Sequence, residues 1–326
     1  MQLGVIGYRN HAAKLIRLVN SFKDVKKIFV YHPDKNKLKN FSIYSKKILI
    51  TSDINKLNVV DGVIIASRSN SHSDYLNFFS KKKKYIFCEK PPADNEKDLS
   101  AIKKLKKNKI KFNFHLIQTF FSSYVKKTLD LKEFGEPINI TIMVSHGIAF
   151  KKSFNKNWRF NDKNIFSSIT GNLGIHYIRQ LLFWFKKLEL INIHQQTFSK
   201  SKSIDTTNIN LLANKKVNIN ILLSYAAPKI NLIKIIFTNG YLEMKDGKID
   251  KYSPRDVFDN KGQFKIPKLK KVKYFKNSTE HNYEGLVKNL KIFIKYIKNK
   301  KYFKESDFRD DIKSAEIILK MKKFDN

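Results

Sequence analysis

The sequence predicts an α/β protein of two parts: a doubly wound parallel sheet first, then an α+β part with a mostly antiparallel sheet. Strand and helix patterns alternate up to about residue 118, whereas alternating apolar segments separated by turn signals follow residue 120. A length of 326 residues with 42% hydrophobic content is sufficient for two cores. We therefore place the domains at residues 1–118 and 119–326.

The first part contains six short apolar runs that are typical of strands, separated by turns or helical patterns. The run from Gly62 to Ala66 is continuously apolar, as expected for a strand covered on both faces. Asp94 is placed to cap a helix that extends to Lys107. Strands that alternate with helices predict parallel pairing, and ligands of such sheets bind beyond the carboxyl ends of the strands. The expected strands are residues 3–6, 27–31, 48–50, 62–66, 85–88 and 111–116, and the expected helices are residues 12–22, 71–83 and 94–107.

The second part consists of segments in which apolar and polar residues alternate, which is typical of half-buried strands. Turn dipeptides at Asn214-Lys215, Asn239-Gly240 and Asp246-Gly247 predict antiparallel hairpins. A strongly apolar helical segment, residues 171–185, interrupts the strands. The expected strands are residues 138–145, 207–212, 217–224 and 232–237, and two further helices are expected at residues 281–298 and 308–321.

The net charge of +37 allows two interpretations. A basic face would bind nucleic acid or another polyanion through phosphate contacts. However, only seven of the 65 basic residues are Arg, the residue type usual in phosphate and base recognition, and the lysines are spread along the chain. We therefore favour a solvated surface with a compositional bias and expect no nucleic-acid partner. An anionic substrate or cofactor would still be attracted to such a charge.

We expect a reducing compartment, the cytoplasm. Cys88 is the only cysteine, so no internal disulfide can form. The N-terminus, Met1 to Gly7, starts on an apolar run without a basic leader, so no signal peptide is expected. No apolar stretch approaches the ~20 residues that a membrane span requires, so we expect no membrane partner.

A glycine-containing turn follows the first strand and partly matches the dinucleotide pattern G-x-G-x-x-G/A. Gly7 and Ala12 match its first and third places, whereas Arg9 stands at the middle one. A middle glycine normally lets the backbone approach the pyrophosphate at the helix N-terminus; arginine adds bulk there but also a cation that could bind phosphate. The alternative is an ordinary tight turn that binds nothing. The cofactor-binding candidates of this turn are Gly7, Arg9, Asn10, His11 and Ala12.

The residue that would contact the adenosine ribose is expected at the end of the second strand, where an acid is usual. This chain has His32 at that place, with Lys35 and Lys37 nearby. Without a carboxylate to repel a 2′-phosphate, NADP is at least as plausible as NAD. The alternative is that His32 is a solvated loop residue.

The fifth strand ends at Cys88-Glu89-Lys90-Pro91-Pro92. A lysine before proline is held in an extended conformation, and at a strand's carboxyl end the ammonium of Lys90 would point into the ligand crevice. An isolated Glu-Lys-Pro triplet is more often a solvated loop. The interpretation that Lys90 points into the crevice therefore depends on the position of the triplet at the end of a predicted strand.

Several segments together resemble the Gfo/Idh/MocA family of oxidoreductases over essentially the whole chain. The combination of Glu-Lys-Pro in register with the strand pattern and a later Leu-Gly-Ile-His segment is specific. The segments that carry the resemblance are Gly4 to Gly7, Ala66 to His72, Cys88 to Pro91, Trp158-Arg159 and Gly171 to His176.

The resemblance implies a nicotinamide cofactor, NAD or NADP, bound by an N-terminal Rossmann domain at a site that includes Glu89 and Lys90. Lys90 would lie beside the nicotinamide and the reacting carbinol, and Pro91 would follow a cis peptide bond. A large, open antiparallel sheet in the second domain would often form an oligomer interface, so a homo-oligomer is expected. Ser67, Ser69 and His72 would lie near the cofactor, although Arg68 and Ser69 depart from the family's Thr-Pro-Asn-x-x-His pattern.

The apolar helix carries the remaining catalytic candidates. Asn172 and His176 are four residues apart and so project from one helical face. A histidine of nearly neutral pKa can accept an alcohol proton while hydride leaves the same carbon, although a lone histidine on an apolar helix is more often structural. Many family members have Asp at the Asn172 position and another three residues after the histidine, where Arg179 stands here. Neither replacement can stabilise an imidazolium as a carboxylate does.

We therefore expect an NAD(P)-dependent oxidoreductase that transfers a hydride to or from a secondary alcohol of a sugar, cyclitol or nucleotide sugar. Either His176 or Lys90 accepts the proton. Trp158 and Arg159 could contact a sugar face or an anionic group, and no metal is expected. One alternative is a catalytically weakened binding protein with the same fold, suggested by Arg9, Asn172 and Arg179, which all depart from the family pattern at functional positions. A polyanion-binding protein is less favoured.

Overall fold

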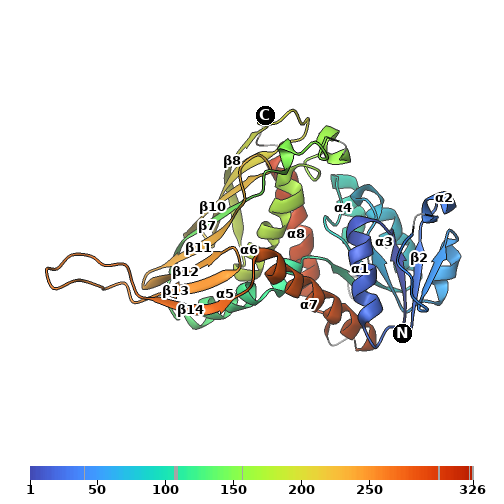
Figure 1. Ribbon diagram of the computed structural model, residues 1–326, viewed down its shortest axis with the longest axis horizontal. Helices are drawn as coiled ribbons and strands as arrows, with labels where there is room; N and C mark the ends of the chain where they lie inside the picture. Colours follow the sequence, from blue (N-terminus) through green and yellow to red (C-terminus); the bar gives the residue numbers. More distant parts are fainter. Residues whose placement is uncertain (40, 106–108, 156, 300–301, 323, 325–326) are drawn as a thin grey trace. The chain divides into compact units, whose positions relative to one another are not determined.

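The computed structural model describes residues 1–39, 41–105, 109–155, 157–299, 302–322 and 324, and these form two compact units (Figure 1). The first unit comprises the described residues of Met1–Phe114 and Val287–Ala315, and the second those of His115–Leu286 and from Glu316 onward. Residues 287–315, which we had assigned to the second domain, thus belong to the first unit. The functional division at residues 118 and 119 stays a prediction.

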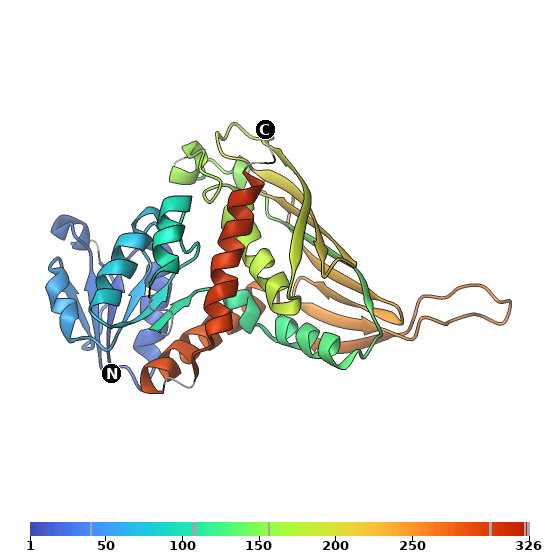
Figure 2. The same cartoon turned by 180° about the vertical axis from the view of Figure 1, so that it is seen from behind.

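The first unit contains a parallel six-stranded sheet in the order β3-β2-β1-β4-β5-β6. Since parallel crossovers are right-handed, the reversal of strand order between β1 and β4 places α1 on one face and α3 and α4 on the other (Figures 1 and 2). The predicted doubly wound sheet is confirmed. Its strands are β1 (Gln2–Ile6), β2 (Lys27–Tyr31), β3 (Ile48–Thr51), β4 (Gly62–Ile65), β5 (Tyr85–Cys88) and β6 (Ile110–Phe112), and its helices are α1 (Asn10–Ser21), α2 (Lys35–Leu38), α3 (His72–Lys81) and α4 (Glu96–Lys103).

The core of the first unit also uses chain from the C-terminal region. The ring of Phe293 packs 5.4 Å from that of Phe87 on β5, and the ring of Phe308 packs 5.9 Å from that of Phe112 on β6. All four side chains are buried, at about 1.5–3 kcal/mol each. Strands β5 and β6 are therefore covered by residues far away in sequence.

The expected cap of the fourth helix is wrong by one residue. Asn95, not Asp94, caps α4, because its side-chain oxygen accepts a hydrogen bond from the backbone N–H of Asp98 at 2.8 Å. Asp94 instead accepts a hydrogen bond from Ser69 at 3.3 Å. The predicted end of this helix at Lys107 lies outside the described residues.

The second unit contains an eight-stranded sheet in the order β14-β13-β12-β11-β7-β10-β9-β8. Its pairings are antiparallel except for β7 with β10, which are parallel. The predicted large, mostly antiparallel sheet is confirmed, although β8, β12, β13 and β14 were not foreseen as strands. The strands are β7 (Pro137–Ser145), β8 (Leu188–Gln196), β9 (Thr206–Ala213), β10 (Val217–Ser224), β11 (Ile230–Phe237), β12 (Gly240–Lys245), β13 (Lys248–Tyr252) and β14 (Leu269–Tyr274), and the remaining helices are α5 (Phe120–Leu131), α6 (Ile175–Trp184), α7 (Ser278–Lys298) and α8 (Glu305–Met321).

The two faces of this sheet differ. One face packs against a π-helical turn, Thr170–Gly174, and the helix α6 that continues from it; a Cβ added to Gly174 would lie 3.2 Å from the side chain of Leu223. The other face carries a ladder of asparagine amides across four strands, in which each side chain donates a hydrogen bond to the next. The ladder consists of Asn139, Asn220, Asn210 and Asn192.

Candidate functional site

The turn after β1 brings the backbone of two strands close together at the point where the strand order reverses. Gly7 has φ +98°, and a Cβ on it would lie 2.9 Å from the carbonyl oxygen of Ala66, which follows β4. Helix α1 begins directly after this turn, and its N-cap residue Arg9 makes no side-chain capping hydrogen bond. A close backbone approach and an uncapped helix N-terminus suit a pyrophosphate, so these residues fit a dinucleotide.

The arginine at the middle place of the motif, Arg9, contacts the preceding residue, Tyr8. Its Nε donates a hydrogen bond to the hydroxyl of Tyr8 at 2.8 Å, and its guanidinium carbon lies 5.2 Å from the centre of that ring. The Tyr8 ring in turn meets His32 edge-on at 5.5 Å. The structure thus brings Arg9 and His32, the predicted phosphate and ribose contacts, against the same tyrosine.

In the usual motif a carboxylate at the end of β2 binds the ribose. In this chain the acid near that place, Asp34, caps a helix instead. Asp34 accepts a hydrogen bond from the backbone N–H of Asn36 at 2.9 Å and caps α2. The Nδ1 of His32 accepts from the backbone N–H of Asp34 at 3.1 Å. His32 is therefore held by its own loop, which leaves both NAD and NADP compatible with this end of the site.

Replacing Gly7 with alanine should weaken cofactor binding about tenfold, measured as the Kd for NADH and NADPH by fluorescence titration. The methyl group would press on the Ala66 carbonyl, and the positive φ costs about 1–2 kcal/mol for a non-glycine residue. Gly262→Ala is the matched control, since Gly262 also has a positive φ (+74°) but an added Cβ meets nothing within 4 Å. Equal Kd values for the Gly7 variant and the wild type would contradict a cofactor at this turn.

The loop after β4 is tied to the turn after β5 by a buried histidine. His72 is 1% exposed, its Nδ1 lies 2.8 Å from the carbonyl oxygen of Pro91, and its Nε2 lies 3.2 Å from that of Ser67. Burial lowers the pKa of His72, so the imidazole is neutral and donates one hydrogen bond, which we assign to the shorter contact. His72 thus positions the turn at Pro91, and Ser67 and Ser69 line the same loop.

The peptide bond between Lys90 and Pro91 is cis, as the resemblance implied. Lys90 is half-buried at the exit of β5, next to the buried Glu89. Its charge acts on both Glu89 and His11, so the three groups lie close together. The first unit therefore presents a lysine at the carboxyl end of its sheet.

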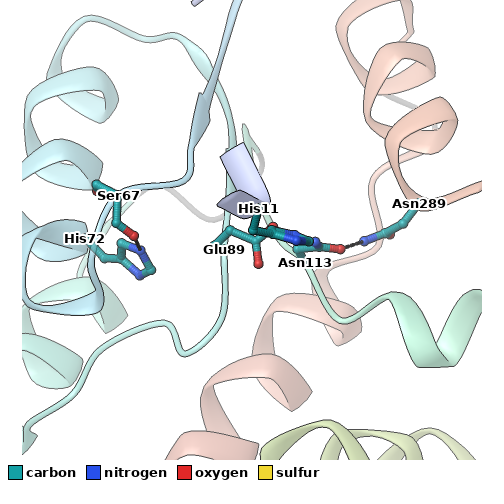
Figure 3. A network of polar contacts seen from close by, with 6 residues as sticks. All are labelled: His11, Ser67, His72, Glu89, Asn113 and Asn289. Carbon is teal, nitrogen blue, oxygen red and sulfur yellow. Dashed lines mark hydrogen bonds and ion pairs between the residues drawn. The ribbon is translucent and has the colours of Figure 1, made fainter. Parts of the chain in front are cut away.

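Glu89 is the centre of a polar network that connects four segments of the first unit (Figure 3). Its Oε1 accepts hydrogen bonds from His11 Nε2 at 2.8 Å and from Asn113 Nδ2 at 2.6 Å. Asn113 Oδ1 in turn accepts from Asn289 Nδ2 of α7 at 2.8 Å. The network joins the cofactor turn, the end of β5, the end of β6 and α7.

The network contains an ion pair between His11 and Glu89. The carboxylate raises the pKa of His11 against the opposing effect of burial. Burial alone would raise the pKa of Glu89, but the His11 charge, the two hydrogen bonds and the Lys90 charge outweigh it and lower that pKa. Glu89 is thus ionised beside Lys90.

In the second unit, Asn172 of the π-helical turn donates a hydrogen bond to the hydroxyl of Tyr225 at 2.5 Å. Burial raises the pKa of Tyr225, against the Asn172 hydrogen bond and the charge of Arg159, so the phenol is neutral. The ring of His146 lies 4.9 Å from that of Tyr225. Because β7 and β10 are parallel, the residues that follow them, His146 and Tyr225, meet at one edge of the sheet.

His176 lies one helical turn further on, in α6. It is 7% exposed, and its ring lies 4.9 Å from that of His115 in an edge-on arrangement. Arg179, on the same helix, is fully buried. A π-helical turn at Asn172 followed by an α-helix at His176 replaces the single regular helix that we expected.

Trp158 and Arg159 form a pair, with the guanidinium carbon 4.6 Å from the centre of the indole ring. Burial lowers the pKa of Arg159, against the smaller opposing electrostatic effects of Tyr225 and Asp162. The pair therefore lies near Tyr225 and Asn172 within the second unit.

Lys90 belongs to the first unit and His176 to the second, so their meeting in one pocket remains a prediction.

Sequence reasoning missed Asn113, Asn289 and Tyr225. Asn113 directly follows the last residue of β6, and Tyr225 directly follows the last residue of β10, a position that could have been inspected, whereas Asn289 gave no signal.

Two models of one family match the chain. The model described as "Oxidoreductase family, NAD-binding Rossmann fold" matches residues 1–114, and the GFO/IDH/MocA C-terminal domain matches residues 123–243. The chain belongs to the Gfo/Idh/MocA oxidoreductase family. The resemblance seen in the sequence is thereby confirmed, and the first unit of this family member contains an NAD-binding Rossmann domain.

A curated relative of this Gfo/Idh/MocA chain is the 2,7-anhydro-N-acetylneuraminate hydratase of Escherichia coli (strain K12). The two are 29% identical over 141 residues, which are 41% of this chain and 37% of the relative. The match thus spans little more than a third of that protein.

Solved structures with the same fold cover nearly the whole chain. A myo-inositol dehydrogenase from Corynebacterium glutamicum has a TM-score of 0.75 and 14% identity, covering 99% of this chain and 96% of its own. An oxidoreductase from Agrobacterium radiobacter in complex with NAD+, L-tartaric acid and magnesium has a TM-score of 0.77 and 18% identity, covering 98% and 94%. A 3-ketoreductase from Actinomadura kijaniata in complex with NADP and TDP-benzene has a TM-score of 0.78 and 13% identity, covering 99% and 97%.

The described residues contain no helix of the length and apolarity needed to cross a bilayer. They also contain no group of three or more His, Cys, Asp or Glu side chains that could hold a metal ion.

Proposed function

We propose that this family member is an NAD(P)-dependent oxidoreductase that transfers a hydride to or from a secondary alcohol of a sugar, cyclitol or nucleotide sugar. The observation that carries the proposal is Lys90 at the exit of β5, before a cis proline that His72 holds and beside an ionised Glu89. A lysine so placed at the carboxyl end of an NAD-binding sheet suits a group that polarises the reacting hydroxyl.

When bound, the nicotinamide accepts or supplies the hydride. The proposed role of Lys90 is to orient and polarise the alcohol oxygen. Either His176 accepts the hydroxyl proton, or Lys90 accepts it while His176 orients the substrate. Asn172 cannot accept a proton, but its hydrogen bond to Tyr225 fixes the start of the helix that carries His176.

The remaining features of the proposal concern the whole protein. Residues 1–118 would bind NAD or NADP, and residues 119–326 would bind the substrate. The amide ladder gives one face of the large sheet a row of polar side chains across four strands, and we propose that a homo-oligomer forms through this face. We also propose a cytoplasmic location.

The test is single-turnover hydride transfer, followed as nicotinamide absorbance, with NAD and NADP and a panel of sugars, cyclitols and nucleotide sugars. Oxidation of at least one alcohol by the wild type, and its loss in both Lys90→Ala and His176→Ala, is the expected result. Wild-type rates in both variants would refute the assigned roles.

A second candidate is a binding protein with weakened catalysis. It is favoured by Arg9 at the usual glycine place, by Asn172 at an acid position and by the fully buried Arg179. Under this alternative, NAD and NADP would fail to bind even at millimolar concentration in a fluorescence titration. Tight binding of either cofactor would count against it.

A third candidate is net hydration or dehydration of a sugar, which the name of the Escherichia coli relative suggests. Product analysis distinguishes it from net oxidation, because sugar would be converted without accumulation of reduced nicotinamide. Equal amounts of reduced nicotinamide and oxidised sugar would exclude this alternative.

A further inference from the structure

The guanidinium of Arg159 has N–H groups that donate no hydrogen bond to other described residues. Among the contacts of the described residues, its guanidinium makes no hydrogen bond and no ion pair, and its Nε is buried without a hydrogen-bond partner. Its guanidinium carbon lies 4.6 Å from the centre of the Trp158 indole ring. A half-buried guanidinium normally has its donors satisfied, so an arginine left in this state points to a ligand.

The acid whose charge acts on Arg159 is hydrogen-bonded to other groups. Asp162 raises the pKa of Arg159 through its charge, but its two carboxylate oxygens accept hydrogen bonds from the backbone N–H of Asn164 at 2.9 Å and the hydroxyl of Ser167 at 2.6 Å. These bonds hold Asp162 in its own turn. The guanidinium therefore keeps its positive charge without a bidentate partner.

Two other groups at this place, Tyr225 and its neighbour His146, are neutral. Tyr225 is a buried phenol, and burial lowers the pKa of His146, so neither adds a competing anion. Trp158 is 36% exposed and supplies an apolar ring face beside the cation. An aromatic face next to an unpaired guanidinium suits a sugar ring that carries an anionic substituent.

We propose that Arg159, with Trp158 and Tyr225, binds an oxyanion group on the substrate, so that this chain acts on acidic or phosphorylated sugars rather than neutral ones. The inference rests on the proposed function and narrows its substrate class. A carboxylate and a phosphate present the same paired oxygens to a guanidinium, and the experiment separates them. The net charge of +37 would speed the encounter with such a substrate.

The test measures equilibrium binding by titration calorimetry at about 0.15 M salt, where long-range attraction is screened. Glucuronate and glucose 6-phosphate are each compared with glucose, and inorganic phosphate is the competitor. We expect the wild type to bind one of the two anionic sugars at least about tenfold more tightly than glucose, as a charged bidentate contact provides. Arg159→Gln should abolish that preference, and Arg159→Lys should restore only part of it.

Arg17→Gln is the matched control, because Arg17 is exposed on α1 of the other unit and its replacement removes the same charge. Its preference should equal that of the wild type. An unchanged preference in Arg159→Gln, equal binding of glucose and both anionic sugars, or no binding of either anionic sugar overturns the inference. Titration of NAD and NADP in the same samples reports on the proposed function separately, because cofactor binding can persist while the anion preference fails.

Discussion

Replacing Lys90 with methionine is expected to lower kcat/KM for alcohol oxidation by about 10²–10⁴-fold, the usual contribution of a positioned acid–base group. Methionine keeps the length of the side chain but removes the ammonium that would polarise the hydroxyl. The Kd of the cofactor should change little, because the backbone of the turn is held by His72 at the Pro91 carbonyl. The rate is measured by nicotinamide absorbance and the Kd by fluorescence titration.

Lys97→Met is the control for this variant, since Lys97 is exposed on α4 of the same unit. A rate loss of equal size in the two variants would mean that Lys90 acts only through the overall charge.

The pH profile of kcat/KM for His176→Asn separates the two candidate proton acceptors. If His176 is the acceptor, the limb of the profile near neutral pH disappears; if Lys90 is, that limb stays.

Replacing Glu89 with leucine is expected to cost about 2 kcal/mol in the free energy of unfolding. The change leaves the Asn113 amide and the His11 imidazole without the carboxylate that both donate to. The side chain of His11 is 43% exposed, so water screens its part of the loss. Urea unfolding followed by circular dichroism measures the difference.

The same ion pair makes stability depend on pH in a defined window. The pKa of His11 is raised from its ordinary 6.5, so its contribution is complete below 6.5 and is lost as pH rises through the raised value. The pKa of Glu89 is lowered from 4.5, so its contribution is complete above 4.5 and is lost as pH falls through the lowered value. The pair therefore stabilises the fold most between about pH 4.5 and pH 6.5.

Glu89→Gln tests this window, because glutamine keeps an acceptor for Asn113 but removes the charge. The stability difference from the wild type should be larger at about pH 5.5 than at about pH 9. For His11→Gln, the stability difference from the wild type should likewise be smaller at about pH 9 than at about pH 5.5, since this variant removes the other member of the pair. A difference that does not vary with pH would show that the ion pair contributes nothing.

The sheet of the first unit could be predicted from sequence because its signals are local. Strands β2 and β5 begin and end where the apolar runs do, since a strand covered on both faces needs such a run. The cap of α4 was misplaced because Asp94 and Asn95 are both good capping residues, and a hydrogen bond to Ser69 from another loop decides between them. Local chemistry left that choice open.

The candidate site could be predicted only where its residues form motifs. Gly7 and Lys90 belong to motifs and were found. Asn289 bonds to Asn113 across 176 positions of the chain, and nothing near either residue indicates the other. Tyr225 lies beside His146 because β7 and β10 are parallel. The alternating pattern of apolar residues does not distinguish parallel from antiparallel pairing.

That parallel pair has a consequence for how substrate preference can diverge among such proteins. Two neighbouring parallel strands cannot be joined by a tight turn, so a long connection runs from the end of β7 at Ser145 to the start of β10 at Val217. The excursion contains Trp158, Arg159, Asn172 and His176, together with two strands that add to the edge of the sheet. Insertions and deletions within its loops can therefore remodel recognition while the pairing of the central strands stays intact.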